Sequence, residues 1–210
     1  MALDLEEQEQ VAELKAWWRQ HGNFIVAVIL AAALAFAGWQ GWRWYSASQA
    51  TQAAGLFDSL VKAAQGGDAK ALRDSAGTLI ESYPRTLYAA MGALVAARFH
   101  YDRNDLKAAR AQLEWAVDKA SSDDFRDLAR LRLAAVLMDE KAYDEALKLL
   151  DAKHGVAYES QYAALRGDVL VAKNQPAEAR AAYKLALDKA GREQGAFRET
   201  VRMRLEALGG

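Results

Sequence analysis

Residues 23–42 read NFIVAVILAAALAFAGWQGW, and the rest of the chain is organised around this stretch. It contains no Asp, Glu, Lys, Arg or His. A helix rises about 1.5 Å per residue, so roughly 20 apolar residues match the ~30 Å hydrocarbon core of a bilayer. Tryptophans flank both ends, as expected of rings that lie at the two headgroup layers. They are Trp17, Trp18, Trp39, Trp42 and Trp44. We predict a single transmembrane anchor over residues 23–45.

Two other interpretations of this stretch have to be weighed. A buried core helix could be equally apolar, but the rest of the chain is made of short amphipathic segments with no place for it. A cleavable signal peptide is the stronger rival, because Ala35-Phe36-Ala37 offers a cleavage site of the A-x-A kind. A signal peptide requires a short basic leader, whereas five acidic residues and only Lys15 and Arg19 precede the apolar run here. The sequence therefore favours an uncleaved anchor.

Residues 1–22 form a separate segment before the anchor in this interpretation. Val11, Leu14 and Trp18 recur at helical spacing and predict an amphipathic helix with an acidic remainder. It is either a surface helix at the membrane or a docking helix for a partner. Lys15 and Arg19 lie before the span and Arg43 alone lies directly after it, which favours a cytoplasmic N-terminus and a translocated main domain.

Composition points to an all-α protein without nucleic-acid binding. The 210 residues contain 27 Lys and Arg against 28 Asp and Glu, so no part carries a field of one sign that would attract nucleic acid. Cysteine is absent, which excludes disulfides and thiolate metal sites. Prolines occur only at positions 84 and 176, and helix-forming residues are abundant.

Residues 46–210 show an internal repeat. Four segments share a small polar turn followed by apolar residues at helical spacing: GGDAKAL, RNDLKAA, EKAYDEA and KNQPAEA. The last three align on Ala109, Ala146 and Ala179, which are 37 and 33 residues apart. This period is typical of helix–turn–helix repeats of the tetratricopeptide kind, in which a small residue allows close helix pairing.

The C-terminal segment predicts a capping helix. Phe197, Val201, Leu205 and Leu208 form one apolar stripe, and the last repeat of a solenoid leaves a face that such a helix covers. The predicted fold is therefore a single transmembrane helix followed by a tetratricopeptide-like solenoid with a C-terminal cap.

No pattern for catalysis appears. The three histidines, His21, His100 and His154, lie in unrelated segments without a second ligand at helical spacing. No nucleophile elbow, phosphate-binding loop or zinc-binding H-E-x-x-H motif occurs. We expect no enzymatic activity, no cofactor, no metal and no small-molecule substrate.

The candidate site is a protein-binding groove lined by the first helix of each repeat. Repeat register predicts nine residues on it: Met91, Leu94, Arg98, Tyr101, Leu128, Leu131, Met138, Gln161 and Val171. Apolar and methionine side chains suit contacts with varied partners. The alternative is that these residues belong to the core or are covered by residues 46–65.

Three stretches together carry a resemblance to a known family: EQVAELKAWWRQHG, GWQGWRWY and LRGDVLVAKNQPAEARAAY. The chain resembles the YfgM-type ancillary subunits of the bacterial Sec translocon over nearly all of its length. The resemblance implies an inner-membrane protein with a periplasmic repeat domain. It further implies partnership with the SecYEG channel, with the membrane-anchored periplasmic chaperone PpiD and with exported proteins.

Two functions of different classes remain open from the sequence. The first is a binding module that assists exported chains or chaperones at the translocon. The second is a regulatory scaffold that sequesters a signalling partner of an envelope stress pathway. In that case residues 1–20 are the candidate contact on the cytoplasmic side. A pull-down in detergent distinguishes them, because it recovers translocon subunits in one case and a response regulator in the other.

Overall fold

The computed structural model describes residues 5–209, and the side chains of residues 9–209. Within this range the chain is helical and has no β-strand, so the predicted all-α class is confirmed. By its packing the chain divides into two units, Met1–Ser48 and Gln49–Gly210. The sequence places the corresponding boundary between residues 45 and 46. The two units are described separately below.

The first unit is the beginning of helix α1 (Leu5–Gly66). Its apolar side chains point outward all round, with Phe24 72% exposed and Leu34 74% exposed. Only 6% of its most apolar window is buried. A helix that is apolar on every side needs a non-aqueous surrounding. By length and composition it is a candidate membrane span, as the sequence predicts.

Aromatic and cationic side chains interact at both ends of the apolar stretch. Trp17 stacks on His21 with ring centroids 5.2 Å apart, and the Arg43 guanidinium lies 4.8 Å from the Trp39 ring centroid. Residues 5–22 of the predicted N-terminal segment are helical, and α1 continues from them through Asn23 without a break. Residues 1–4 lie outside the described range.

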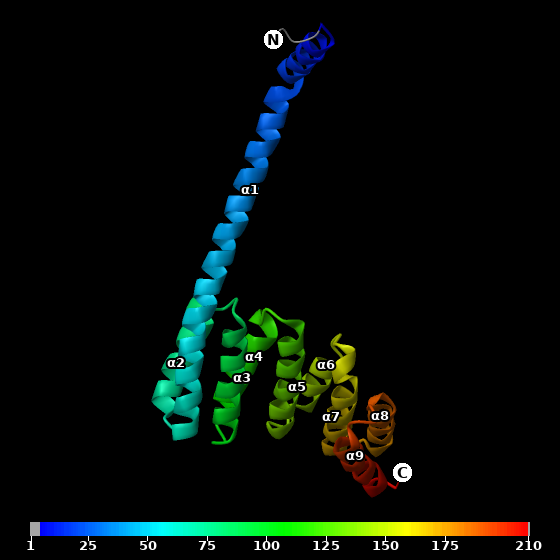
Figure 1. Cartoon of the computed structure of the whole chain (residues 1–210). Helices are drawn as coiled ribbons and strands as arrows, with labels where there is room; N and C mark the ends of the chain where they lie inside the picture. The colour runs from blue at the N-terminus through cyan, green and yellow to red at the C-terminus, as the bar shows by residue number, and fades with distance from the viewer. Residues whose placement is uncertain (1–4, 210) are drawn as a thin grey trace. The chain divides into compact units, whose positions relative to one another are not determined.

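The second unit is a row of helix pairs (Figure 1). Residues 49–66 of α1 pair with α2, and the remaining pairs are α3 with α4, α5 with α6, and α7 with α8. A short 3-10 helix, η1, precedes α7, and α9 follows α8. The bounds are α2 Ala69–Ser82, α3 Leu87–Tyr101, α4 Leu106–Lys119, α5 Asp123–Asp139, α6 Tyr143–Leu150, η1 Val156–Tyr158, α7 Glu159–Ala172, α8 Pro176–Lys189 and α9 Gly195–Ala207.

The turn inside each pair has the same backbone geometry. One residue per turn adopts a left-handed conformation, always two positions before the second helix: Gly67 (φ 74°), Asn104 (φ 60°), Lys141 (φ 62°) and Asn174 (φ 59°). The following backbone N–H donates to a carbonyl five residues back, as from Gln175 to Leu170 at 2.8 Å. This Schellman arrangement ends the first helix by satisfying its last carbonyls.

The repeat register predicted from sequence is confirmed by burial. Five positions after each left-handed residue lies a completely buried side chain: Leu72, Ala109, Ala146 and Ala179. Pro176 occupies the first position of α8, where a helix loses no backbone donor. The first repeat carries a leucine where the others carry alanine.

Three groups of buried apolar residues form the core. The central one joins α3 to α7, the second joins residues 49–66 to α2 and α3, and the third joins α7, α8 and α9. Val201 of α9 is 1% exposed, and Phe197, Leu205 and Leu208 pack around the third group. The predicted capping helix is therefore confirmed.

Candidate protein-binding surface

The first helices of three repeats, α3, α5 and α7, lie in sequence along the domain. Helix α3 contacts α5, and α5 contacts α7, in addition to the contacts within each pair. Six side chains that line cavities along these helices form what we call the first-helix surface. It consists of Arg98, Tyr101, Arg132, Met138, Asp139 and Val171.

A cavity of about 290 Å³ opens between α3 and α5. Arg98 and Tyr101 of α3 and Arg132 of α5 line its polar part. Four apolar residues, Ala97, Leu113, Ala135 and Val136, line the remainder. We call it the Arg98–Arg132 cavity.

A second cavity, of about 540 Å³, lies at the C-terminal ends of α5 and α7. Met138, Asp139 and Val171 belong to its lining. The Tyr101 hydroxyl, in the first cavity, donates a hydrogen bond to Asp139 Oδ2 at 2.6 Å. This bond joins the linings of the two cavities, so the first-helix surface is continuous from α3 to α7.

Helix α9 contributes to this second cavity through Arg204. Its guanidinium donates to both carboxylate oxygens of Asp168, at 2.8 and 2.6 Å. Asp168 also accepts a hydrogen bond from the Tyr183 hydroxyl at 2.8 Å. The capping helix therefore fixes a carboxylate of α7 and a phenol of α8 in one orientation.

The structure brings four of the nine groove residues named from the sequence into this surface. Arg98 and Tyr101 line the first cavity, and Met138 and Val171 line the second. Tyr101 is 37% and Val171 is 42% exposed, so both are accessible to a partner.

The other five lie elsewhere. Leu94 is only 5% exposed and belongs to the central core, so it is not available for binding. Leu128 and Leu131 are half-buried against that core, as Met138 also is. Met91 is half-buried outside both cavities. Gln161 lies at the start of α7, where its side-chain amide is 3.0 Å from Ser160 Oγ.

Arg132, Asp139 and Arg204 are among the cavity residues that the sequence did not identify. Arg132 lies four positions after Leu128 and Asp139 lies seven positions after Arg132, so helical spacing was the available signal. Arg204 had no such signal, because it comes from α9 and reaches α7 across 36 positions of sequence. The repeat register identifies surface residues on the first helix of each repeat. It does not indicate which residues of α9 reach that surface.

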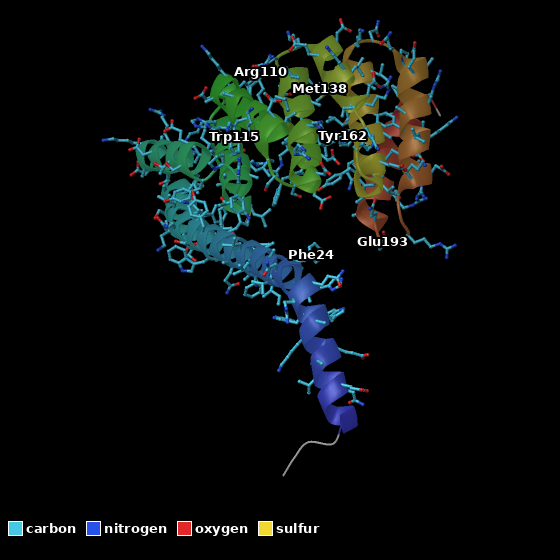
Figure 2. All side chains as sticks on the ribbon, turned by 90° about the horizontal axis from the view of Figure 1, so that it is seen from above. Phe24, Arg110, Trp115, Met138, Tyr162 and Glu193 are labelled. Carbon is cyan, nitrogen blue, oxygen red and sulfur yellow. The ribbon has the colours of Figure 1, made fainter. Side chains whose placement is uncertain are left out.

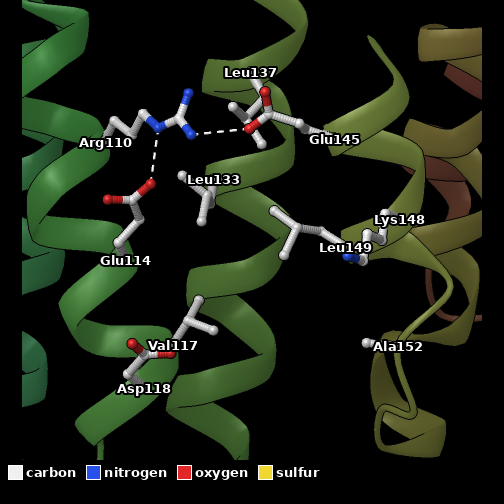
Figure 3. A pocket seen from close by; sticks show the side chains of 10 residues that line it. All are labelled: Arg110, Glu114, Val117, Asp118, Leu133, Leu137, Glu145, Lys148, Leu149 and Ala152. Atoms are coloured by element: carbon white, nitrogen blue, oxygen red, sulfur yellow. Dashed lines mark hydrogen bonds and ion pairs between the residues drawn. The ribbon is translucent and has the colours of Figure 1, made fainter. Parts of the chain in front are cut away.

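A third cavity, of about 510 Å³, lies between α4, α5 and α6 (Figure 3). The Arg110 guanidinium donates to Glu114, Glu140 and Glu145 at 2.8, 3.1 and 2.9 Å. The hydrogen bond to Glu114 is the main reason why the pKa of Arg110 is raised further above its usual value. Because Arg110 is shared among three carboxylates of two repeats, we interpret this cluster as a structural seam.

Metal chemistry has no support in the part of the chain that the structure describes. No group of three or more His, Asp or Glu side chains there is arranged to hold a metal ion. His154 stacks on Tyr162 with ring centroids 4.0 Å apart, and His100 lies 3.2 Å from Asp105 in its own turn. Both histidines take part in packing of the repeats.

The pKa is raised for Tyr101 of the first-helix surface and for the buried Tyr183 of α8. The hydrogen bond to Asp139, followed by burial, raises the pKa of Tyr101. Burial, followed by the hydrogen bond to Asp168, raises the pKa of Tyr183. In the core, burial raises the pKa of Tyr162 to about 12.

These shifts predict a loss of stability in alkali. An unfolded tyrosine ionises at about pH 10, so above that pH the unfolded chain binds fewer protons than the folded one and stability falls as pH rises. The free energy of unfolding of the fragment 49–210 should decline between pH 10 and 12. Denaturant titrations should show a shallower decline for Tyr183→Phe, since one of the shifted groups is removed. An equal decline in both proteins would contradict the assignment.

The fold and its surface define the class of this protein as a helical-repeat module for protein binding, carried on a helix long and apolar enough to cross a membrane. A family model described as a tetratricopeptide repeat-like domain matches residues 15–210. A Neisseria gonorrhoeae protein called "Ancillary SecYEG translocon subunit" is 30% identical over 209 residues, which cover 99% of this chain and all of the relative. The chain belongs to this family of ancillary translocon subunits with a tetratricopeptide-like domain.

Two further relatives carry the same name. The Haemophilus influenzae protein is 28% identical over 186 residues, covering 89% of this chain and 91% of the relative. The Escherichia coli protein is 28% identical over 177 residues, covering 84% of this chain and 85% of the relative. The similarity thus extends over the apolar helix as well as the repeats.

Proposed function

We propose that this protein is an ancillary subunit of the SecYEG translocon in a bacterial inner membrane, and that it acts by binding proteins rather than by catalysis. The observation that carries the proposal is the full-length similarity to the Neisseria gonorrhoeae relative, since it includes both the apolar helix and the repeat domain. The first-helix surface supplies the binding site, with Tyr101 and Val171 as its exposed apolar residues.

The proposal includes an orientation. Lys15 and Arg19 before the span outnumber Arg43 directly after it, and basic residues stay on the cytoplasmic side. The repeat domain is then periplasmic and α1 is retained as an uncleaved anchor. This location gives the domain access to emerging exported chains and to membrane-anchored chaperones such as PpiD, which we propose as its further partners.

The absence of cysteine allows a direct test of orientation. Ala181 of α8 and Ala12 of α1 are exposed, so a single cysteine at either position reports its own compartment. Ala181→Cys should react with a membrane-impermeant maleimide in spheroplasts, whereas Ala12→Cys should react only after lysis. The reverse pattern would contradict the orientation, and a mature chain that starts at Gly38 would contradict the retained anchor.

Site-specific photo-crosslinking in cells tests the partners. A photo-reactive amino acid at Tyr101 or Val171 should give crosslinks to translocon subunits, to PpiD or to exported chains, identified by mass spectrometry. Ala111 serves as the control, because it is equally accessible but lies on α4, a second helix. Crosslinks to a response regulator instead would favour a regulatory scaffold, and equal yields from Ala111 would argue against the first-helix surface as the site.

A further inference from the structure

The guanidinium of Arg132 differs from the other charged groups of the first-helix surface, because Arg98 pairs with Asp102 and Asp139 accepts from Tyr101. Within residues 9–209 it makes no ion pair and no hydrogen bond, although it lines the Arg98–Arg132 cavity. Its neighbours on the chain are engaged, since Arg130 pairs with Asp127 at 2.6 Å and Arg126 donates to the Ala120 carbonyl at 2.7 Å. Arg132 is an exposed residue, so water solvates its guanidinium and its donors are available to a partner.

The electrostatic surroundings of Arg132 also favour a negatively charged partner. Burial, and after it the positive charge of Arg98, lowers the pKa of Arg132, with only a partial opposing effect from Tyr158. Asp102 offsets the charge of Arg98, whereas no carboxylate among the described residues pairs with Arg132. Two like charges on separate helices, α3 and α5, therefore face one cavity.

The two acidic residues at the edge of the cavity, Asp102 and Asp139, already accept hydrogen bonds. Asp102 accepts from Arg98 Nε at 2.8 Å, and Asp139 accepts from the Tyr101 hydroxyl at 2.6 Å. A guanidinium has five N–H donors, so Arg98 retains donors beyond the one bound to Asp102. Arg98 and Arg132 therefore both present free donors to an incoming anion, and Arg132 is the one of the two without a paired carboxylate among the described residues.

The remaining walls restrict what that anion can be. Ala97, Leu113, Ala135 and Val136 are apolar, and they would contribute nothing to a small inorganic anion. A cavity of about 290 Å³ is at the lower end of the ~300–1,000 Å³ range of ligand pockets, so it suits one or two side chains rather than a whole ligand. The surface continues to Met138 and Val171 through the Tyr101–Asp139 bond, as a passing chain requires.

We propose that the Arg98–Arg132 cavity accepts an aspartate or glutamate side chain of a partner segment that crosses the first-helix surface, with a neighbouring apolar side chain against Ala135 and Val136. Guanidinium groups bind carboxylates with paired hydrogen bonds, which gives this contact both strength and direction. The inference deepens the proposed function, because it rests on the first-helix surface being the binding site. It assigns acidic, partly apolar segments as the ones that this surface selects.

Peptide binding to the full chain in detergent tests the inference. The probe is a fluorescein-labelled 12-residue peptide of glutamate, leucine and serine with blocked ends, and its counterpart has glutamine in place of glutamate. The glutamate peptide should bind the wild-type chain at least about tenfold more tightly, since a charge-assisted pair contributes on the order of 1.4 kcal/mol or more. Raising the salt concentration should weaken its binding. Equal binding of the two peptides would overturn the inference.

Variants of the cavity complete the test. Arg132→Gln should bind the two peptides equally and should keep the wild-type melting temperature, because no native partner is lost. Arg132→Lys should retain part of the preference, since it keeps the charge but not the paired geometry. Arg73→Gln in α2, an exposed arginine far from the cavity in sequence, should leave the preference unchanged. If millimolar phosphate competes fully and a free peptide carboxylate binds as well as a side chain, the site is a general anion site and the inference is wrong.

Crosslinking in cells separates this inference from the proposed function. If Arg132→Gln leaves translocon crosslinks from position 101 intact and the peptides are not discriminated, the proposed function stands and the acidic-segment inference fails. If peptide discrimination holds but wild-type cells yield no translocon crosslinks, the inference stands and the proposed function fails.

Discussion

Gly167→Ala should lower the free energy of unfolding of the repeat domain by about 2–3 kcal/mol, near the upper end of what overpacking costs. Gly167 lies in α7 against the ring of Tyr183 from α8, and a Cβ there would be 2.5 Å from Cδ1 and 2.9 Å from Cζ. The ring is 2% exposed and its hydroxyl is bound to Asp168, so it has no free space to move into. At roughly 2–4 °C per kcal/mol for a domain of this size, the melting temperature falls by about 5–10 °C.

Gly77→Ala is the matched control, because it is the same substitution inside α2. A Cβ at Gly77 meets no atom within 4 Å. Alanine is favoured over glycine in a helix by up to about 1 kcal/mol, so this variant should be stabilised. Opposite signs for the two variants in thermal or denaturant unfolding are the expected result. Stabilisation by both variants would show that the α7–α8 contact is not tight.

The second large effect is expected from Asp127→Ala, at about 2–4 kcal/mol of destabilisation. Asp127 of α5 is 4% exposed. Its carboxylate accepts from Arg130 at 2.6 Å and from the Gly155 backbone N–H at 2.8 Å. Its own carbonyl accepts from the Tyr162 hydroxyl at 2.8 Å, on the α7 residue labelled in Figure 2. Removing the carboxylate leaves a partly buried charge and a backbone donor without partners.

Asp123→Ala provides the comparison on the same helix. Asp123 also pairs with an arginine three residues later, Arg126, but its side chain is 87% exposed. Exposed pairs contribute about 0–1 kcal/mol, so this variant should differ little from the wild type in chemical denaturation. Amide hydrogen exchange at Gly155 should become faster only in Asp127→Ala. A small, equal cost for both variants would show that the link between α5 and the segment before η1 is not important for stability.

Sequence reasoning found part of the candidate surface because helical repeats place residues by spacing. The repeat register identified four residues that line two cavities in the structure: Arg98, Tyr101, Met138 and Val171. The same register named Leu94, which is 5% exposed, because a helix face wide enough to bind a partner also borders the core. The distinction between rim and core depends on how far neighbouring helices are rotated, and spacing does not contain that information.

Local patterns in the sequence were sufficient to predict several features of the fold. These are the apolar helix over residues 23–45, the four helix pairs, the turns at Gly67, Asn104, Lys141 and Asn174, and the capping helix. Each follows from composition or periodicity within a few helical turns. Contacts between distant side chains depend on how the helices pack, as Tyr101 meets Asp139 across 38 positions and Arg204 meets Asp168 across 36 positions. Helix packing also leaves Arg132 without a paired carboxylate among the described residues, because charge balance at a cavity depends on side chains from several helices that no single stretch of sequence brings together.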